Sequence, residues 1–502
     1  KTLEELQRII ADLKSAGKKV VHCHGVFDLL HIGHIKHFEE AQAFGDALVV
    51  TISPDEFVHK GPNRPVFMTV LRLEALAALE SIDFVAANKW SNAVETIKTL
   101  QPDIYCKGPD YKDHSDDITG KIDDEEATVK SVGGEIRYTE NITFSSSSLL
   151  NKFGDVYNDS QKTFIQKMLN SQDFDEIKSM VDELKNLKVL VVGETIIDQY
   201  VFCEALGKSG KEPVLVLRDL KMDQYAGGAV AIARHLSDFC GSISLLSMLG
   251  ENKEYEDFIL ESLPDNIKAY FIYKEAAPTI AKKRFVDNIT KSKALGVYSI
   301  NDSQMNGKNK NQLISFLDEL IPKHDLVIVS DYGHGFISKE IAKYISKQSV
   351  FTSLNAQINA ANIGYQTMNN YRDIDCAIIN ETELRHELRD RESNHRDLMK
   401  QLSKQMNTKN LVVTQGSDGA TLYVSADNKY YHCPAFANKV VDKIGSGDAM
   451  LALFSCALKI GINPNLALFI GSLAAAQSVE SIGNSVPVNK KQLLKTFVHA
   501  IK

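Results

Sequence analysis

Residues 19–38 read KVVHCHGVFDLLHIGHIKHF, and this stretch predicts the type of fold in which the chain begins. Its first residues form a short apolar strand, a turn follows at His24 and Gly25, and a helix is expected from about Gly33 to Phe44. A strand that feeds directly into a helix is the repeating unit of a parallel sheet. In such sheets a ligand lies beyond the carboxyl end of the strand, at the N-terminus of the next helix.

The same alternation of strands and helices continues on both sides of this stretch. Apolar spacing predicts helices at 1–16, 70–79 and 93–100, and strands at 47–52, 84–87 and 104–107. We therefore expect an α/β domain with a doubly wound parallel sheet over residues 1–152. Residues 153–187 are polar with apolar positions at helical spacing, and predict a helical linker. A strand at 189–192 then begins a second doubly wound α/β domain, residues 188–502.

The bulk composition excludes several classes of protein. The chain has 502 residues, of which 44% are hydrophobic and 24% charged, and its formal net charge is −8. This balance is typical of a globular protein and argues against nucleic acid or an anionic membrane as a partner. No run approaches the roughly 20 apolar residues of a membrane span. The scattered cysteines contain no CxxC pair and the first residues contain no apolar signal segment, so we expect a cytoplasmic protein with free thiols.

The turn that precedes the helix predicted from about Gly33 to Phe44 has the features of a phosphate-binding site. Helix N-termini attract phosphate through exposed amides and the helix dipole. Gly33 lets the backbone approach closely, and the flanking His31 and His34 can donate hydrogen bonds to a triphosphate as pyrophosphate leaves. A metal site is an alternative, because five histidines lie in this stretch (His22, His24, His31, His34 and His37). His22 and His24 could share one strand face, although no Cys or carboxylate completes a familiar zinc spacing.

Further motifs in this half strengthen the interpretation. The pattern GxFDxxHxGH at residues 25–34 is followed by Arg64-Pro65-Val66, by KGPDY at 107–111 and by FSSSSLL at 144–150. Over about residues 18–152 the chain resembles the cytidylyltransferase-like nucleotidyltransferases. The resemblance implies catalytic roles for His31, His34 and Lys107. It also implies nucleotide or phosphate binding by Gly25, Phe27, Gly33, Arg72, Ser145, Ser146, Ser147 and Ser148.

The serine run and Asp28, the aspartate of the GxFD pattern, also have structural interpretations. The serine run at 145–148 offers hydroxyl and amide donors at a helix start, but taken alone it is more typical of a cap or a loop. Asp28 could orient a histidine, bind Mg²⁺ or form a turn. Attack by a sugar phosphate oxygen needs no strong base, so positioning and charge stabilisation by Arg72 and Lys107 would suffice.

A second site is predicted near the C-terminus, where residues 441–450 read VDKIGSGDAM. Gly445, Ser446 and Gly447 precede an apolar helix at 450–458 and can form an anion hole. Asp448 can accept the proton of a sugar hydroxyl that attacks a γ-phosphate. A glycine turn beside an aspartate is also a common loop.

Over about residues 188–490 the chain resembles the ribokinase-like (PfkB) sugar kinases, through the strand with Asp198, the Gly227-Gly228 turn, Asp331-Tyr332-Gly333 and the final GSGD. The resemblance implies sugar binding by Asp198, Gly227 and Gly228. It implies nucleotide or phosphate binding by Asn380, Glu383, Thr414, Gly416, Gly445, Ser446 and Gly447, with Glu383 acting indirectly on Mg²⁺. Lid strands are expected at 204–225 and about 270–300, and such lids often form homo-oligomer contacts.

Within that family the chain resembles the heptose-phosphate kinase type. Its PTxxKxR pattern matches Pro278 to Arg284, so Lys282 and Arg284 would hold a phosphate on the sugar, although they could also be a solvated strand edge. Three departures concern the substrate side. Ala231 stands where relatives have Asn, His334 where they have Lys, and Leu354–Gln357 where they have a DPK-like segment.

The two halves together resemble the bifunctional ADP-heptose synthase family of surface-glycan biosynthesis, in reversed domain order. The resemblance implies a kinase for a sugar phosphate and a nucleotidyltransferase for a sugar 1-phosphate, with Mg²⁺, ATP for the kinase, and ATP or CTP for the transfer. The alternatives are a different nucleotide-activated sugar or polyol, or a degenerate kinase half that only binds sugar. The expected partners are small sugar phosphates and nucleotides, without nucleic acid or membrane.

Overall fold

The computed structural model describes residues 1–58, 64–109, 121–140, 157–169, 174–358, 362–437 and 439–501. The chain forms two compact units. The first comprises Lys1–Ile165 together with Lys491–Lys502, and the second comprises Gln166–Lys490. Among the described residues, no helix combines the length and the apolar character needed to cross a bilayer.

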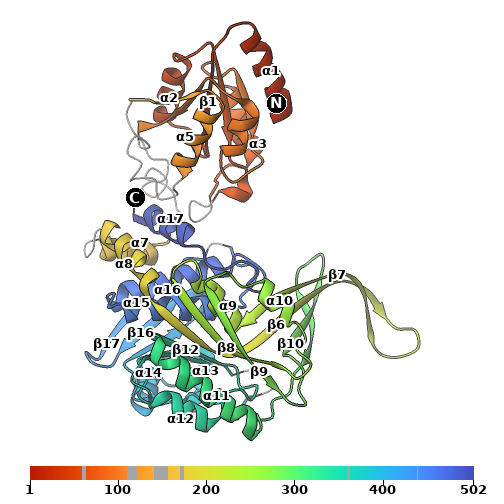
Figure 1. Cartoon of the computed structure of the whole chain (residues 1–502), viewed down its shortest axis with the longest axis vertical. Helices are drawn as coiled ribbons and strands as arrows, with labels where there is room; N and C mark the ends of the chain where they lie inside the picture. Colours follow the sequence, from red (N-terminus) through yellow and green to blue (C-terminus); the bar gives the residue numbers. More distant parts are fainter. Residues whose placement is uncertain are drawn as a thin grey trace. The chain divides into compact units, whose positions relative to one another are not determined.

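The first unit contains a five-stranded sheet in the order β3-β2-β1-β4-β5 (Figure 1). Every neighbouring pair is parallel. The strands are β1 (Val20–Gly25), β2 (Ala47–Ile52), β3 (Phe84–Ala87), β4 (Ile104–Lys107) and β5 (Glu135–Tyr138). The doubly wound parallel sheet that the apolar runs predicted is thereby confirmed, and β1 lies at its centre.

The helices of this unit pack an apolar side against the sheet. They are α1 (Leu3–Ser15), α2 (Ile32–Gln42), α3 (Thr69–Ala77), α4 (Val94–Leu100) and α5 (Lys121–Ser131), with a 3₁₀ turn η1 (Asp55–Phe57). Helix α1 begins with a capping box, because Thr2 accepts the amide of Glu5 and Glu5 accepts that of Thr2. Its Leu3, Leu6 and Ile10 are buried, as the predicted amphipathic helix required.

The predicted linker is helical where it is described. It contains α7 (Asp159–Leu169), α8 (Phe174–Glu183) and the 3₁₀ turn η4 (Leu184–Asn186). The final helix, α17 (Lys490–Ile501), belongs almost entirely to the first unit.

The second unit is organised around β6 (Lys188–Lys208), a long strand that takes part in two sheet regions (Figure 1). Its first half lies in a parallel array in the order β9-β8-β6-β12-β13-β14-β15. The other strands of this array are β8 (Ser242–Gly250), β9 (Ile267–Lys274), β12 (Leu326–Asp331), β13 (Phe351–Ala356), β14 (Cys376–Asn380) and β15 (Asn410–Thr414). Two antiparallel strands, β16 (Ala420–Val424) and β17 (Lys429–Cys433), extend its edge.

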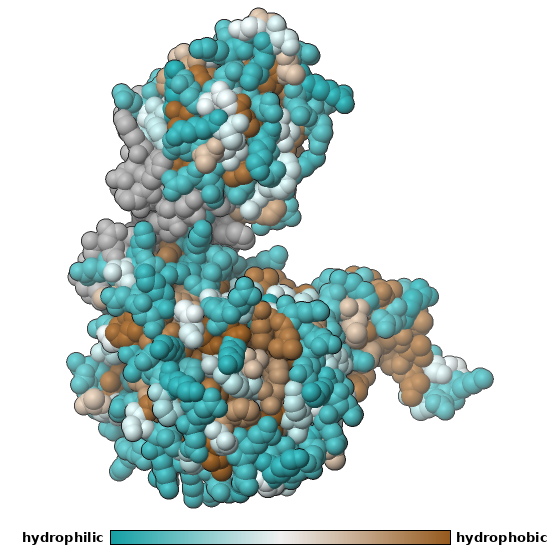
Figure 2. Space-filling model, in the orientation of Figure 1, coloured by the Kyte–Doolittle hydropathy of each residue, from teal (hydrophilic) through white to brown (hydrophobic). Residues whose placement is uncertain are grey.

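The second half of β6 forms the predicted β lid with β7 (Leu215–Gly228), β10 (Ala281–Asp287) and β11 (Lys293–Ser299). The predicted lid range 270–300 was partly wrong, because residues up to Lys274 belong to β9 in the central array. Figure 2 shows hydrophobic residues on the lid hairpin, where Leu206, Leu215 and Met222 are exposed. The expected homo-oligomer stays a prediction.

Helices cover the central array of the second unit. They are α9 (Ala229–Leu236), α10 (Glu256–Glu261), α11 (Gly307–Leu320), α12 (Lys339–Ser346), α13 (Glu381–Leu388), α14 (His395–Met406), α15 (Ser446–Lys459) and α16 (Pro464–Ser478), with 3₁₀ turns η5 (Ile321–Lys323), η6 (Met368–Asn370) and η7 (Gly416–Asp418). Helix α15 is buried from Ala449 to Ala457, which confirms the buried helix predicted after the GSGD motif.

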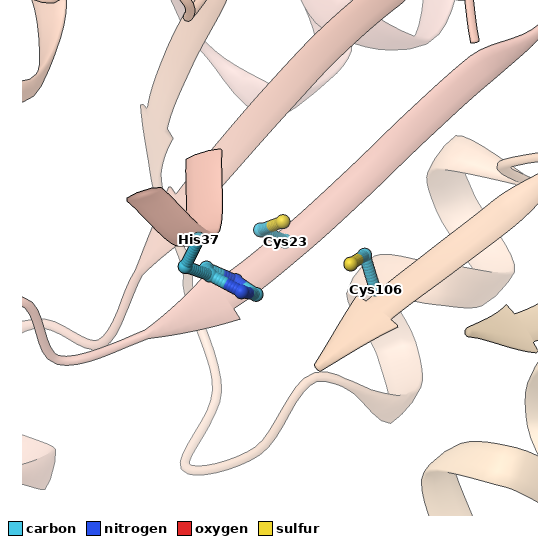
Figure 3. A group of neighbouring side chains, drawn as sticks. All are labelled: Cys23, His37 and Cys106. Carbon is cyan, nitrogen blue, oxygen red and sulfur yellow. The ribbon is translucent and has the colours of Figure 1, made fainter. Parts of the chain in front are cut away.

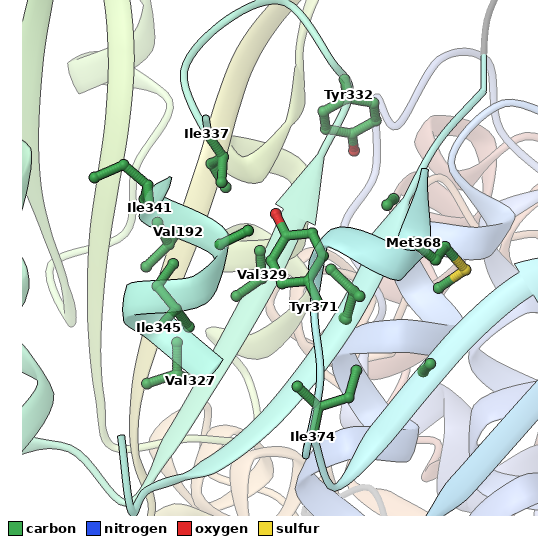
Figure 4. Close-up of a cluster of buried hydrophobic side chains, with 14 of the residues drawn as sticks. Val192, Val327, Val329, Tyr332, Ile337, Ile341, Ile345, Met368, Tyr371 and Ile374 are labelled. Atoms are coloured by element: carbon green, nitrogen blue, oxygen red, sulfur yellow. The ribbon is translucent and has the colours of Figure 1, made fainter. Parts of the chain in front are cut away.

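The core of this unit extends to the carboxyl ends of its strands. Val192, Val327 and Val329 of the central strands pack with Ile341 and Ile345 of α12 (Figure 4). Two tyrosines, Tyr332 and Tyr371, belong to the same buried cluster but carry hydroxyl groups. A buried tyrosine hydroxyl normally finds a hydrogen-bond partner, and both of these bond aspartates at the candidate site described below.

Candidate active sites

In the first unit, His31 and His34 meet at the N-terminus of α2. His31 is the N-cap, and its Nδ1 accepts a hydrogen bond of 3.1 Å from the amide of Gly33. Because Nδ1 is an acceptor, the proton of the neutral ring is on Nε2, where it can be donated to a ligand. Burial lowers the pKa of His31 and favours this neutral form. The two imidazole rings stack with centroids 3.9 Å apart.

Gly25 and Phe27 shape the floor beneath these histidines. Phe27 has a φ of +46° and packs edge-on against the ring of His34, with centroids 5.3 Å apart. A Cβ at Gly25 would lie 2.8 Å from Cζ of Phe27, so a larger residue at position 25 would displace the aromatic ring. Both residues thus support the site through shape, and their predicted contact with a nucleotide stays a prediction.

Asp28 is used to hold a loop. Its carboxylate accepts hydrogen bonds from Nε of Arg64 at 2.5 Å and from the amides of Val66 and Phe67 at 2.6 and 3.1 Å. Of the interpretations left open by the sequence, this geometry favours the turn-forming one, because the carboxylate oxygens bind backbone and guanidinium groups.

The guanidinium of Arg72 also forms its hydrogen bonds within the protein. Its guanidinium donates to the carbonyls of Val26 at 2.6 Å, Ser53 at 2.9 Å and Phe67 at 2.9 Å, and it pairs with Asp55 at 2.7 Å. The side chain is fully buried. These bonds indicate a structural role in fixing the ends of β1 and β2, and the predicted contact of Arg72 with phosphate stays a prediction.

Lys107 ends β4, next to the carboxyl end of β1. Its ammonium pairs with the carboxylate of Glu125 at 2.7 Å, and the hydroxyl of Tyr105 donates to the same carboxylate at 3.0 Å. The sequence offered no signal for Glu125, because no helix was predicted at 121–131. Asp110 and Tyr111 of the KGPDY motif and the serines at 145–148 lie outside the described residues.

Two of the histidines that suggested a metal site as an alternative have a simpler structural role. His22 and His24 do share one face of β1, and both bond the hydroxyl of Thr51 on β2 at 2.8 Å. Their common partner is thus a threonine of the neighbouring strand.

In the second unit, Asp448 lies in the first turn of α15, directly after the glycine turn. Gly445 has a φ of +91°, and a Cβ there would lie 1.7 Å from Oδ1 of Asn484. Glycine is therefore required both by the backbone conformation and by the close approach of Asn484. The predicted anion hole at Gly445, Ser446 and Gly447 coincides with the N-terminus of this 14-residue helix, where amides and dipole favour a phosphate.

The surroundings of Asp448 change the pKa of its carboxyl group. The pKa of Asp448 is raised to about 7, mainly because the carboxylate is buried away from solvent and also because Asp198 lies nearby. The hydroxyl of Tyr332, which donates to Asp448 at 2.8 Å, and the ammonium of Lys282 lower it. A general base is most effective when its pKa is close to the working pH, so the environment suits the predicted role of Asp448.

The predicted sugar-binding residues converge beside it. Lys282 of β10 pairs in register with Asp198 of β6, and Nη1 of Arg284 bonds Oδ1 of Asp198 at 2.5 Å. A Cβ at Gly227 would lie 2.3 Å from Oδ2 of Asp198, which explains the glycine on the opposing strand β7. Gly228, next to it, has a φ of +63°. Burial lowers the pKa of Lys282. The lid base thus holds two cations and one carboxylate.

Glu194 was missed by the sequence interpretation. Its buried carboxylate accepts the amides of Tyr332 and His334 at 2.9 and 3.0 Å, and so fixes the turn that presents Tyr332 to Asp448. Burial and the neighbouring Asp331 raise the pKa of Glu194. Asp331 in turn accepts the hydroxyl of Tyr371 at 2.8 Å.

The three departures from the family pattern occupy distinct places. His334 is buried and its Nδ1 lies 2.7 Å from Oδ1 of Asp302. Ala231 is buried in α9. In the segment 354–357, Leu354 is buried, and Asn355 donates to the carbonyl of Ile378 on β14 at 2.9 Å.

The nucleotide-side motif NxxE forms a helix capping box. Asn380 accepts the amide of Glu383 at 2.8 Å, and Glu383 accepts that of Asn380 at 3.1 Å. Thr414 pairs in register with Asn380 at the carboxyl ends of β15 and β14, and Gly416 follows with a φ of +60°. The second oxygen of Glu383 accepts the amide of Ile358 at 3.1 Å. The predicted indirect role of Glu383 toward Mg²⁺ stays a prediction.

The pKa of Asp448 predicts a pH dependence. Since the carboxylate must be unprotonated to accept a proton, kcat/KM for sugar phosphorylation should rise with pH and level off above about 7. Below that value we expect a loss approaching tenfold per pH unit. Initial rates of ADP formation from pH 5.5 to 8.5 at low sugar phosphate would check this, with circular dichroism to confirm folding. A flat profile would exclude Asp448 as the titrating base.

Two family models match separate parts of the chain. Residues 186–491, more than half of the chain, match the model of the pfkB family carbohydrate kinases. Residues 22–180 match the cytidylyltransferase-like model. The chain shares its fold with phosphofructokinase-2 from Escherichia coli solved with substrates and products, at a TM-score of 0.51 and 16% identity over 63% of this chain and all of that one.

Among curated proteins, the chain is 40% identical over 138 residues to the bifunctional protein HldE of Aliarcobacter butzleri, covering 27% of this chain and 29% of the relative. It is 44% identical over 117 residues to the bifunctional protein HldE of Sulfurimonas denitrificans, covering 23% of this chain and 24% of the relative. The chain thus spans less than a third of the length of these relatives.

Proposed function

Because the chain belongs to the pfkB family of carbohydrate kinases, we propose that residues 188–502 transfer the γ-phosphoryl group of ATP to a hydroxyl of a sugar phosphate. We further propose that residues 1–152 join a sugar 1-phosphate to a nucleotide. The chain would then be a bifunctional enzyme that makes a nucleotide-activated sugar of the ADP-heptose type. The two HldE relatives, which are named bifunctional, and the cytidylyltransferase-like match support this pairing.

The observation that carries the kinase proposal is the convergence of Asp448, Lys282 and Arg284 at the base of the lid. The sugar hydroxyl gives its proton to Asp448 while its oxygen attacks the γ-phosphorus and the bond to ADP breaks. The amides at the start of α15 stabilise the negative charge of the transferred group. Lys282 and Arg284 are suited to a phosphate that the sugar already carries.

Mg²⁺ would enter with ATP and neutralise charge on its phosphates. The Glu383 carboxylate is nearly buried, and among the described residues one hydrogen bond reaches each of its oxygens, so that each keeps a second lone pair toward this part of the chain. It can therefore accept a hydrogen bond from a water on the ion, which fits the indirect role expected from the family.

For the nucleotidyl transfer, an oxygen of the sugar 1-phosphate attacks the α-phosphorus of the nucleotide and pyrophosphate leaves. His31 and His34, stacked at the N-terminus of α2, would donate hydrogen bonds to the departing phosphates. No general base is needed, because the attacking phosphate oxygen is already an anion. Lys107 adds a positive charge that Glu125 holds in place until a phosphate arrives.

A coupled assay of pyrophosphate release tests the transfer and its nucleotide. The purified chain is given a heptose 1-phosphate with either ATP or CTP. We expect release with ATP and at least tenfold less with CTP, a difference of about 1.4 kcal/mol in transition-state binding. Release only with CTP, or only with another phosphorylated sugar or polyol, would keep the two-site architecture and replace the product. The absence of release with any pair would overturn the transferase assignment.

A degenerate kinase half is the second candidate. The complete glycine turn, Asp448 with its raised pKa, and the intact capping box of Asn380 and Glu383 all favour an active site over a sugar-binding module.

A further inference from the structure

Two cysteines in the first unit lie side by side on neighbouring strands. Cys23 of β1 and Cys106 of β4 are paired in register, so their side chains emerge on the same face of the sheet. Both are buried in the cluster formed with Phe38 of α2. Figure 3 shows the two sulfur atoms pointing toward one another, with His37 of α2 beside them.

The three side chains are close enough to share one ion. One ligand atom from each of Cys23, His37 and Cys106 lies within 4.8 Å of the other two. In a tetrahedral zinc site with bonds of about 2.3 Å to sulfur and 2.0–2.1 Å to nitrogen, ligand atoms are about 3.5–3.8 Å apart. The observed spacing therefore needs only a small inward shift of the side chains.

The hydrogen bonds of His37 prepare its ring for a metal. Its Nδ1 lies 2.9 Å from Oγ1 of Thr139, whose hydroxyl is itself directed to the carbonyl of Lys107 at 3.5 Å. When the threonine proton is donated to that carbonyl, its oxygen accepts Nδ1–H of His37, and the lone pair of the ring is on Nε2. Metal-bound histidines are typically oriented in this way by a second hydrogen bond from the other nitrogen.

The second unit offers an internal comparison. Cys240 and Cys456 are also buried and their sulfur atoms lie 3.8 Å apart. Among the residues that the structure describes, no histidine or carboxylate joins that pair, and Cys23, His37 and Cys106 are the one group of three with ligand atoms this close. Close buried thiols alone are explained by packing; an oriented imidazole beside them is not.

We propose that Cys23, His37 and Cys106 bind a single Zn²⁺ ion. Each thiol loses its proton to solvent as its sulfur binds, and the two thiolates and the neutral imidazole form three protein ligands. The ion would join β1, α2 and β4, the three elements that carry Gly25, His31, His34 and Lys107. It is a structural ion that holds the nucleotidyl-transfer site together, and its binding does not depend on the proposed reaction.

Elemental analysis of the purified full-length chain tests this proposal. After addition of zinc and removal of unbound metal, we expect about one equivalent per chain in the wild type. Cys106→Ser should reduce this at least tenfold, because one thiolate ligand is removed. The matched control, Cys456→Ser in the thiol pair without a histidine, should retain the wild-type amount. Equal zinc in Cys106→Ser and wild type, or less than about a tenth of an equivalent in wild type, would overturn the proposal.

A second measurement keeps the test valid if Cys106→Ser fails to fold. His37 is only partly buried, so His37→Gln should fold, as circular dichroism would confirm. Loading with Co²⁺ should give the intense near-ultraviolet absorption of thiolate–cobalt bonds in wild type, with a reduced intensity and a shifted visible band in His37→Gln. Identical spectra in folded wild type and His37→Gln would show that the imidazole is not a ligand and would contradict the site.

Discussion

Replacement of Asp448 by asparagine is expected to abolish sugar phosphorylation, with a loss in kcat of about 10²–10⁴-fold. The two side chains have nearly the same shape. An asparagine oxygen can still accept the hydrogen bond from the hydroxyl of Tyr332, which in the wild type lies 2.8 Å from Oδ1 of Asp448. What is lost is the capacity to take the proton of the attacking hydroxyl. The anion hole at the start of α15 remains, so ATP binding should be nearly unchanged.

The measurement is ADP formation with a sugar phosphate, alongside pyrophosphate release from the transfer reaction. Transfer should be unaffected, because Asp448 belongs to the second compact unit and the histidines to the first. Asp427→Asn, an exposed carboxylate between β16 and β17, serves as the matched control and should keep full kinase activity. Retention of more than about a tenth of the wild-type rate by folded Asp448→Asn would reject its role as general base.

The converse result is expected for His34→Ala. Nucleotidyl transfer should fall by about 10²–10³-fold, the cost of removing one positioned hydrogen-bond donor from a developing charge. The substitution also removes the stacking partner that lies 3.9 Å from the ring of His31, so the remaining histidine should be less well ordered. Phosphorylation of the sugar should continue at the wild-type rate.

This prediction is checked with the same pair of assays. Lys36→Ala is the matched control, because Lys36 is on the same helix but exposed, and pairs with Glu39 in a surface ion pair of small energetic value. It should leave both activities intact. If folded His34→Ala lost both activities, the two sites would not act independently and the assignment of one reaction to each unit would fail.

Strong local patterns account for what could be predicted of the fold. The strands at 47–52, 84–87 and 104–107 were predicted to the residue, because each is a short apolar run bounded by polar residues. Helix α5 and strand β5 were not predicted. β5 lies at the edge of the sheet with alternate residues exposed, and α5 is polar over most of its length, so neither carries a strong hydrophobic pattern.

The residues of the candidate sites also divide into those that a local sequence pattern identifies and those that it does not. The motif residues on glycine turns could be identified from sequence, because a helix N-terminus after a strand and a required glycine are both local features. Partners such as Glu125 for Lys107 and Asn484 for Gly445 could not, since they come from distant segments.

The amino-acid sequence by itself determined that two α/β units follow one another and that each has a glycine-rich turn before a helix, because hydrophobic periodicity and backbone freedom act over a few neighbouring residues. Only the tertiary structure decided which distant side chains meet. Strand register placed Cys23 beside Cys106 and Lys282 beside Asp198, and the burial of Glu194 fixed the turn that carries Tyr332. Such contacts depend on how strands pair across the sheet, and pairing between distant segments is not encoded in any local pattern.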